Sequence, residues 1–367
     1  MPLFGRTTVK IECVAGLELE KRIQEMANRL APAVVFGAVW SDGTTFTRAA
    51  GKADLQTGSN ISVGAPLTWF SITKLFTAAA VVQLAEKRCL DLDDPVSRHL
   101  PERRLAKAGH EATIRHLLSH SAGLPNPIPV TWIHPANEAA PGLEALVNRL
   151  MRSNPTLNFE PGMKSSYSNL GYLLLGQVIE RASGSCYEEY LRLNILDPLG
   201  CDSTGFDIPA DRPTGYQRRR SLMGLAARWM LGSRFFGKPV AGYWPLRPFA
   251  VDGAPYGGLI GPIHDLLKFA QMILCNGTGE YSRVLEAASV RGMLESATSA
   301  RGRKLPIGLG WHLGRANGQA FAFHVGGGGG YRSELRVYPD LGYAAAVIST
   351  ETSFPTHQLT RLIIERP

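Results

Sequence analysis

The sequence has few cysteines, and their placement excludes two common uses of this residue. The 367 residues contain five cysteines, an odd number, and no two of them follow Cys-x-x-Cys spacing. Cysteine-based zinc sites need thiolates at such short spacings, and small disulfide-stapled domains need a dense, paired set. We therefore expect reduced thiols, a reducing compartment and no metal site at these positions, which are Cys13, Cys89, Cys186, Cys201 and Cys275.

Long apolar runs are also absent. No stretch of about 18 apolar residues, the length that spans a bilayer, occurs in the chain. The first residues include basic ones but no apolar segment of the kind found in secretory signals. We expect a cytoplasmic protein from the sequence as written, or a periplasmic or exported one if a leader precedes it. The length allows one large domain or two interleaved domains.

Acidic residues are missing from one segment, residues 212–251, which holds eight basic residues. The net charge of +8 is therefore local, and the rest of the chain is balanced. No nucleic-acid-binding motif accompanies this segment, so we expect no nucleic-acid partner. The basic residues are Arg212, Arg218, Arg219, Arg220, Arg228, Arg234, Lys238 and Arg247.

The same segment is rich in aromatic residues, and Leu222, Leu225, Ala226 and Trp229 recur at helical spacing. Three interpretations stay open. The segment is a lid that selects apolar acyl groups, an interfacial helix that makes peripheral contact with anionic lipid, or an insertion packed on the rest of the protein.

A serine and a lysine one helical turn apart, Ser71 and Lys74, open an alanine-rich helical segment that ends near Lys87. Residues three apart in a helix share a face, so the hydroxyl and the amine can meet. A desolvated lysine can take the proton of a serine and make it nucleophilic. The alternative is a serine helix cap beside a solvated lysine.

Tyr167 and Asn169 stand two residues apart, just before another helical segment. A tyrosine near a lysine ammonium has a lowered pKa and can shuttle protons. Asn169 can donate to a substrate carbonyl or hold Lys74. The alternative is a packed tyrosine beside an asparagine helix cap.

His324 precedes Val325 and a run of five glycines, residues 326–330. Such a run lets a substrate or another backbone approach closely, and an N–H there can pair with that of Ser71 in an oxyanion hole. A phosphate loop is disfavoured because no Gly-Lys-Ser/Thr follows. The second His-x-Gly, at His312, lacks the glycine run and is interpreted as an ordinary strand histidine.

His116 and His120, four residues apart, have the spacing of a metal pair. No third ligand is evident, so we interpret them as part of the helix and turn that support the site. The sequence indicates no metal and no cofactor.

Strand-like segments occupy both chain ends and helix-like segments the middle, which predicts an antiparallel sheet built from the two ends with a mainly helical insertion. We expect a sheet domain from residues 10–75 together with 255–367, and a helical domain from 76–254 that includes 212–251. The expected strands are 33–40, 44–50, 308–315, 320–325, 332–338 and 343–349, and the expected helices are 17–30, 113–119, 142–152, 169–182, 186–194, 264–275 and 284–297.

The three motifs described above, in this chain order, resemble those of the penicillin-recognising serine hydrolases. That family includes class C β-lactamases, D-alanyl-D-alanine carboxypeptidases and family VIII-type carboxylesterases. Residues 117–125 and 257–269 are similar to it as well, and the resemblance covers roughly residues 20–350. It implies an α+β fold, a three-layer sandwich of sheet and flanking helices with an inserted helical domain, and an active site in the groove between them.

The resemblance also implies a role for each motif residue. Ser71 would be the acylated nucleophile, Lys74 and Tyr167 would share the general-base role, and Asn169 would line the pocket. The N–H groups of Ser71 and Gly327 would form the oxyanion hole.

The third motif departs from the β-lactamase pattern, because His324 and Val325 stand where those enzymes usually carry Lys-Thr before Gly326. Neutral histidine supplies little charge and valine supplies no hydrogen bond for a carboxylate. The sequence therefore favours a carboxylesterase that acts on small or medium acyl esters through an acyl-serine. The alternatives are a D-amino-acid amidase, a D-alanyl-D-alanine carboxypeptidase or a weak β-lactamase, and, from another class, a penicillin-binding type of protein that acylates without turnover.

Overall fold

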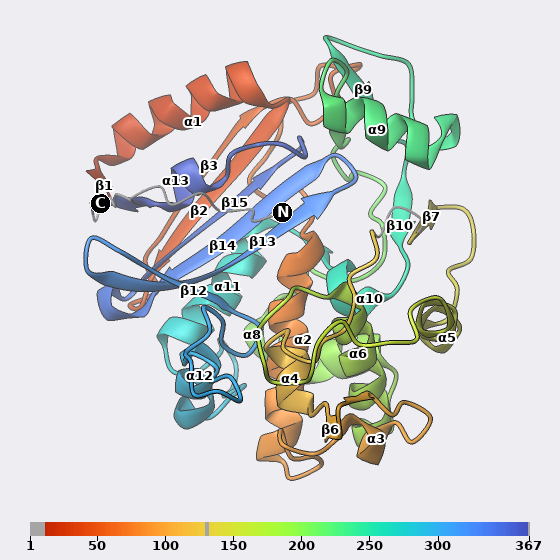
Figure 1. Ribbon diagram of the computed structural model, residues 1–367. Coiled ribbons are helices and arrows are strands. Elements are labelled where there is room, and N and C mark those ends of the chain that lie inside the picture. The colour runs from red at the N-terminus through yellow and green to blue at the C-terminus, as the bar shows by residue number, and fades with distance from the viewer. Residues whose placement is uncertain (1–11, 129–131, 366–367) are drawn as a thin grey trace.

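A six-stranded antiparallel sheet forms the centre of the protein (Figure 1). The computed structural model describes residues 12–128 and 132–365. Neighbouring strands follow the order β12-β13-β14-β15-β2-β3. Strand β15 pairs with β2 from Tyr343↔Trp40 to Ser349↔Val34, so segments from both chain ends meet inside the sheet. The predicted architecture is confirmed. The strands are β2 (Ala33–Trp40), β3 (Thr45–Gly51), β12 (His312–Ala316), β13 (Gln319–Gly328), β14 (Tyr331–Tyr338) and β15 (Tyr343–Ser349).

Helices cover both faces of this sheet. Every residue of β2 is buried, and successive side chains point to opposite faces. Val35 belongs to the core that includes α11 (Ile263–Leu274), whereas Phe36 belongs to the core beneath α1 (Gly16–Leu30). Figure 1 shows α1 and α11 on either side of the strands. The three layers follow from a central strand that is apolar on both faces.

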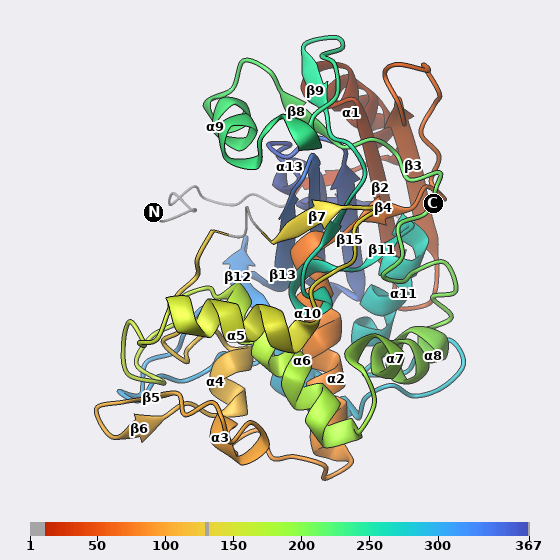
Figure 2. The same ribbon diagram turned by 90° about the vertical axis from the view of Figure 1, so that its right-hand side faces the viewer.

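A helical region adjoins the α11 face of the sheet, as Figure 2 shows. Its central helix is α2 (Thr73–Glu86), in which every residue from Thr73 to Leu84 is buried. Alanines within α2 let neighbouring helices approach closely, and α6 and α7 pack against it. The remaining helices of this region are α3 (Val96–His99), α4 (Ile114–Leu118), α5 (Leu143–Ser153), α6 (Asn169–Ser183), α7 (Tyr187–Leu191), α8 (Asp197–Leu199) and α10 (Ala254–Gly257).

Short paired strands tie the outer segments to this frame. The pairs are β1 (Glu12–Val14) with β16 (Leu362–Ile364), β4 (Leu67–Thr68) with β11 (Ile260–Gly261), β5 (Ala106–Lys107) with β6 (His110–Glu111), β7 (Ile133–Pro135) with β10 (Phe249–Val251), and β8 (Tyr216–Arg218) with β9 (Tyr243–Pro245). Two further helices are α12 (Ala287–Leu294) and α13 (His357–Thr360). The 212–251 segment holds β8, α9 (Leu222–Leu231) and β9. Within 12–128 and 132–365, no helix has the length and apolar character to cross a bilayer.

Several element ends differ from the sequence-based expectation. Strand β12 starts at His312 rather than 308, because Gly308 N–H donates to Trp311 O and closes a turn there. Strand β13 continues through Gly328 instead of ending at 325, since its glycines pair with β14. Helix α12 is shorter than expected, and α7 runs into a π-helical turn, η3 (Arg192–Leu196). The proposed domain boundaries stay a prediction, and residues 10, 11, 366 and 367 lie outside the described part.

Candidate active site

Ser71 lies at the point where a short 3₁₀ turn, η1 (Phe70–Ile72), runs into α2. The preceding Phe70 has a φ of 49°, which is an uncommon backbone conformation for a non-glycine residue. Backbone conformations of this kind cluster at functional sites, where the surrounding structure holds them. The turn packs against β13, so Ser71 faces the glycine-rich strand.

Gly326 brings that strand into contact with the turn. A Cβ atom at this position would lie 2.1 Å from the carbonyl oxygen of Trp69 and 3.1 Å from the amide nitrogen of Ser71. No side chain fits in that space, so the glycine is required by close approach of two backbones. Gly327, the next residue along, is exposed. The structure therefore brings the serine amide and the Gly326–Gly327 segment side by side.

Lys74 is fully buried, and its amine contacts the serine. The Nζ atom lies 3.0 Å from Ser71 Oγ and donates to the carbonyl oxygen of Tyr256 at 2.7 Å. Three tyrosine rings surround it, those of Tyr167, Tyr172 and Tyr256, at 5.0 to 5.6 Å. Burial lowers the pKa of the Lys74 amine well below its usual value. A neutral amine in this position can accept the serine proton.

The Tyr167 side chain forms a hydrogen bond with Ser71. The pKa of its phenol shifts in the direction opposite to the sequence-based expectation. Burial raises the pKa of the phenol above its usual value, and a hydrogen bond with Ser71 offsets only part of this rise. The expected lowering of the Tyr167 pKa is wrong because Lys74 is itself desolvated and does not supply a stable ammonium. The phenol therefore stays protonated and can pass on a proton only while it receives another.

Three histidines gather around the Tyr167 ring. Their ring centroids lie 4.5 Å (His120), 6.2 Å (His312) and 6.0 Å (His324) from that of Tyr167. Burial is the largest cause that lowers the pKa of all three imidazoles, that of His312 to about 4. All three side chains are consequently neutral at pH 7.

His324 is the member of this group that the sequence singled out. Its side chain is 1% exposed, and Nδ1 donates to the carbonyl oxygen of Val325 at 3.1 Å. Its Nε2 atom is buried and has no hydrogen-bond partner within the described residues. Position 324 therefore supplies neither a cation nor an exposed donor to the groove.

Asn169 occupies the first position of α6, next to the tyrosine motif. Its backbone N–H donates to Asn126 Oδ1 at 3.0 Å, and the cap of the helix is Ser168, whose Oγ accepts from Gly171 N–H at 3.3 Å. Among the described residues, the Oδ1 atom of Asn169 has no hydrogen-bond partner. The sequence suggested that Asn169 could hold Lys74, but the Lys74 amine forms its hydrogen bonds with Ser71 Oγ and the carbonyl oxygen of Tyr256.

Sequence reasoning missed two contributors to this site. The carbonyl oxygen of Tyr256 accepts a hydrogen bond from Lys74. No sequence motif marks this contact, because every residue has a backbone carbonyl. His312 was interpreted as an ordinary strand histidine, yet its ring lies 5.2 Å from that of His324. It pairs with Phe323 across the β12–β13 ladder, and strand alternation points the adjacent His324 to the opposite face, so the register alone does not predict this contact.

The histidine pair at positions 116 and 120 serves local structure. Nδ1 of His116 accepts the N–H of Thr113, and Nδ1 of His120 accepts the N–H of Ser168. Over the part of the chain that the structure describes, His, Cys, Asp and Glu form no group of three that could hold a metal ion.

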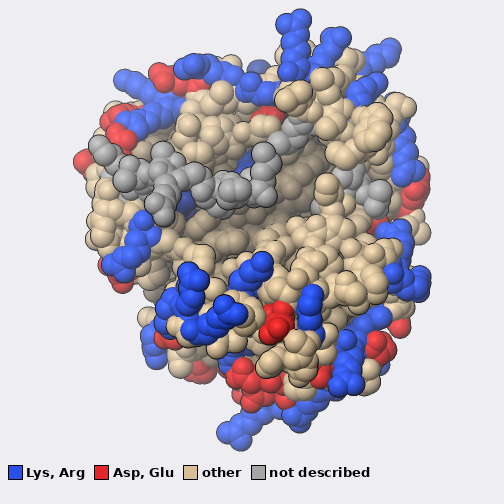
Figure 3. Space-filling view, viewed as in Figure 1, with Lys and Arg blue, Asp and Glu red and all other residues tan. Residues whose placement is uncertain are grey.

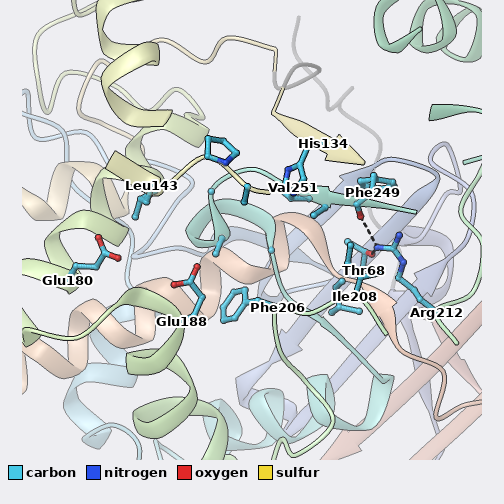
Figure 4. A pocket seen from close by; sticks show the side chains of 18 residues that line it. Thr68, His134, Leu143, Glu180, Glu188, Phe206, Ile208, Arg212, Phe249 and Val251 are labelled. Carbon is cyan, nitrogen blue, oxygen red and sulfur yellow. Dashed lines mark hydrogen bonds between the residues drawn. The ribbon is translucent and has the colours of Figure 1, made fainter. Parts of the chain in front are cut away.

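The face in Figure 3 is hollowed near its centre, where the visible surface is mostly uncharged. A separate cavity has a volume of about 390 Å³, and Figure 4 shows its lining. Glu180 and Glu188 stand at one end of it, and Arg212 stands at the other beside Thr68 and Phe249. The Phe249 ring stacks on Phe70 at 6.4 Å. Ser71, Lys74 and Tyr167 do not line this cavity, so it is distinct from the candidate active site.

Comparison with known proteins places this chain in a family. Residues 19–365 match the Beta-lactamase family. The chain is 28% identical over 338 residues to Penicillin-binding protein 4 of Amycolatopsis lactamdurans, covering 89% of this chain and 84% of that protein.

Two solved structures share the fold over nearly their whole length. They are a D-amino acid amidase from Ochrobactrum anthropi SV3 (TM-score 0.76, 22% identity, 93% and 94% of the two chains) and EstCE1, a hydrolase with promiscuous acyltransferase activity (TM-score 0.73, 19% identity, 94% and 98%). The chain belongs to the Beta-lactamase family and is a serine hydrolase of the superfamily that includes β-lactamases and penicillin-binding proteins.

Proposed function

We propose that this hydrolase is a carboxylesterase that acts on small or medium acyl esters through an acyl-Ser71 intermediate. The observation that carries the proposal is the state of His324, which is buried, neutral and bonded to its own chain neighbour. A site for a substrate carboxylate needs a fixed cation or several donors at this place. Each such contact that is missing from a buried site costs about 1.5–3 kcal/mol. Esters without a free carboxylate do not lose this binding energy.

The proposed acylation step uses the contacts around Ser71. Its Oγ forms a bond to the acyl carbon while its proton passes to the neutral Lys74 amine, 3.0 Å away. The ester C–O bond then breaks, and the alkoxide leaves with a proton passed from the Lys74 ammonium through the Tyr167 hydroxyl. The phenol gives one proton and receives another, which suits its raised pKa.

Deacylation follows the same route in reverse. A water molecule replaces the alcohol, transfers a proton through Tyr167 and Lys74, and attacks the acyl carbon. The bond to Ser71 breaks, and the serine regains its proton. The N–H groups of Ser71 and Gly327 are the proposed donors to the oxyanion in both steps, which the close packing at Gly326 supports.

A substrate panel tests this proposal. We would compare p-nitrophenyl acetate, butyrate and octanoate with a chromogenic cephalosporin, a D-alanyl anilide and D-phenylalanine amide. We expect kcat/KM for the best ester to exceed that for the cephalosporin by at least about a hundredfold, which corresponds to the two missing carboxylate contacts. Faster cleavage of the cephalosporin or of a D-amino acid amide would replace the esterase proposal with a β-lactamase or an amidase.

Matched serine variants identify the nucleophile. Ser71→Ala should lower ester kcat by at least about a thousandfold, since a catalytic unit without its nucleophile retains only residual activity. Ser166→Ala is the control, because Ser166 is exposed and one residue from Tyr167. Full activity in Ser71→Ala would exclude Ser71 as the nucleophile. A single burst of one product per enzyme, without turnover, would indicate a protein that acylates and does not deacylate.

A further inference from the structure

The outer face of α9 exposes large apolar side chains to solvent. Leu222 is 88% exposed, Leu225 is 53% exposed and Trp229 is 85% exposed. These residues are three and seven positions apart, so they lie on one face of the helix. Met230 beside them is 43% exposed. Single exposed apolar residues are ordinary, but a contiguous stripe of them indicates an interaction surface.

The inner face of α9 is already occupied, so the outer stripe is not required to hold the helix. Ala227 and Leu231 pack against the edge of the main core. The Arg228 guanidinium lies over the rings of Phe236 and Trp244, at 5.8 Å and 5.0 Å from their centroids. The helix is also capped at its start, where Ser221 Oγ accepts the N–H of Gly224 at 2.9 Å. Helix α9 is therefore held in place by its inner face and its cap, and its apolar stripe points outward.

The position of α9 in the fold leaves this stripe accessible. Figures 1 and 2 both show α9 at the periphery beside β9, away from the helical region around α2 and α6. It packs mainly against the neighbouring turn η4 (Ser233–Phe235) of its own segment.

Basic side chains surround the stripe. Arg219 and Arg220 precede α9, Arg234 and Lys238 follow it, and all four are exposed. No acidic residue occurs anywhere in 212–251. Figure 3 shows Lys and Arg side chains gathered at the edge of the molecule where Figure 1 places α9 and β9. The surface thus combines an apolar and aromatic stripe with a positive rim.

We propose that α9 and its flanking basic residues form a docking surface for an anionic phospholipid membrane. The helix would lie in the plane of the interface, with Leu222, Leu225 and Trp229 among the lipids and the basic residues at the headgroups. Tryptophan prefers this depth because its ring is apolar and its N–H is polar. Each lysine or arginine near an anionic surface strengthens binding roughly fivefold.

Two other kinds of partner fit these features less well. A second copy of the chain would bring two positive rims together without any acidic residue in the segment to compensate. A nucleic acid would use the basic residues but would leave the exposed leucines in water. An anionic membrane matches both features, because its headgroups attract the basic rim and its acyl chains accept the apolar stripe.

Trp229 provides a direct readout of the contact. The sequence has six tryptophans, and the other five, Trp40, Trp69, Trp132, Trp244 and Trp311, are buried. We would titrate the full chain with vesicles of phosphatidylcholine alone and of phosphatidylcholine with about one third phosphatidylglycerol. We expect the Trp229 emission to shift to the blue and to be quenched by brominated acyl chains when anionic vesicles are added. The protein should partition to these vesicles at least tenfold more strongly than to vesicles of phosphatidylcholine alone. Added salt should weaken this binding.

Variants then separate the two components of the surface in a vesicle flotation assay. Leu222→Ser with Trp229→Ser, and Arg219→Gln with Arg220→Gln, should each lower partitioning at least tenfold. Leu17→Ser and Tyr281→Ser are matched controls, since these residues are 75% and 67% exposed at other places and should leave binding unchanged. Ester hydrolysis in solution should be unaffected by all four variants, so this test is independent of the proposed function.

Three results would overturn the proposal. The first is an unchanged Trp229 emission with anionic vesicles, and the second is equal binding to both kinds of vesicle. The third is a blue shift that depends on protein concentration without lipid, because this would identify a second copy of the chain as the occupant.

Discussion

The imidazole of His120 packs against the phenol of Tyr167 in a tilted arrangement, with 4.5 Å between the ring centroids. The same histidine holds the backbone on both sides of this tyrosine. Its carbonyl oxygen accepts the N–H of Ser166 at 2.8 Å, and its Nδ1 accepts the N–H of Ser168 at 3.2 Å. His120 itself has a φ of 52°, in the left-handed region. The position of the Tyr167 hydroxyl beside Ser71 therefore depends on one strained histidine.

Substitutions at His120 should separate its hydrogen bond from its backbone conformation. Asparagine places an acceptor where Nδ1 lies and tolerates a positive φ, so His120→Asn should keep kcat within about fivefold of the native value. His120→Gly keeps the conformation but removes the acceptor, which costs about 1–3 kcal/mol and should lower kcat about ten- to a hundredfold. Steady-state ester kinetics check this, with KM expected to change little.

The critical observation is which of the two His120 variants has the higher kcat. If His120→Gly is as active as His120→Asn, the hydrogen bond to Ser168 does not position Tyr167. A parallel loss of thermal stability in both variants would instead indicate a purely structural role.

The activity of the enzyme should rise with pH because Lys74 must lose its proton to act as a base. Its lowered pKa moves this requirement below the range of an ordinary lysine. We expect kcat/KM for an ester, corrected for spontaneous hydrolysis, to increase as pH rises through the pKa of this amine and then to level off. Lys74→Ala should abolish this dependence together with most of the activity. A decrease of kcat/KM over the same rise would contradict a neutral Lys74.

Folding stability should fall in mild acid because of the buried histidines. The folded pKa of His312, about 4, is below the ordinary value of 6.5, so the unfolded chain binds more protons between these two values. The stability that His312 contributes is complete above pH 6.5 and is lost as pH falls toward 4, by about 3 kcal/mol in total. His120 and His324 act in the same direction.

Urea unfolding at a series of pH values measures this loss. His312→Phe should flatten the dependence of the unfolding free energy on pH, whereas His110→Gln, a change at an exposed position, should not. An equal slope in native protein and His312→Phe would show that His312 is not buried in its neutral form.

Gly326 should not tolerate even a methyl group. In Gly326→Ala the new Cβ would meet the Trp69 carbonyl at 2.1 Å, so β13 must move away from η1 and from the Ser71 amide. A displaced oxyanion donor costs about a hundredfold or more in kcat. The matched control is Gly292→Ala in α12, where a Cβ has nothing within 4 Å and a helix gains about 0.5–1 kcal/mol from alanine. Native kcat in Gly326→Ala would remove this strand from the proposed oxyanion hole.

The sequence by itself determined the family, the sheet from both chain ends and the three motifs, because these depend on local patterns. Periodicity marked α1 and β2 to within a residue or two, since one apolar stripe and one apolar run suffice to define them. The spacing of Ser71 and Lys74 on one helical turn is likewise a local property, and the structure places their side chains 3.0 Å apart.

Only the tertiary structure decided the protonation states and the exposed surfaces. The pKa of Tyr167 rises because segments that are distant in sequence bury it, which no local pattern reports. The gathering of His120, His312 and His324 depends on strand register and on a turn from another part of the chain. The exposure of Trp229 depends on which face of α9 its neighbours cover. Burial results from contacts between remote residues, and burial sets both the charge of these groups and the partners that they can reach.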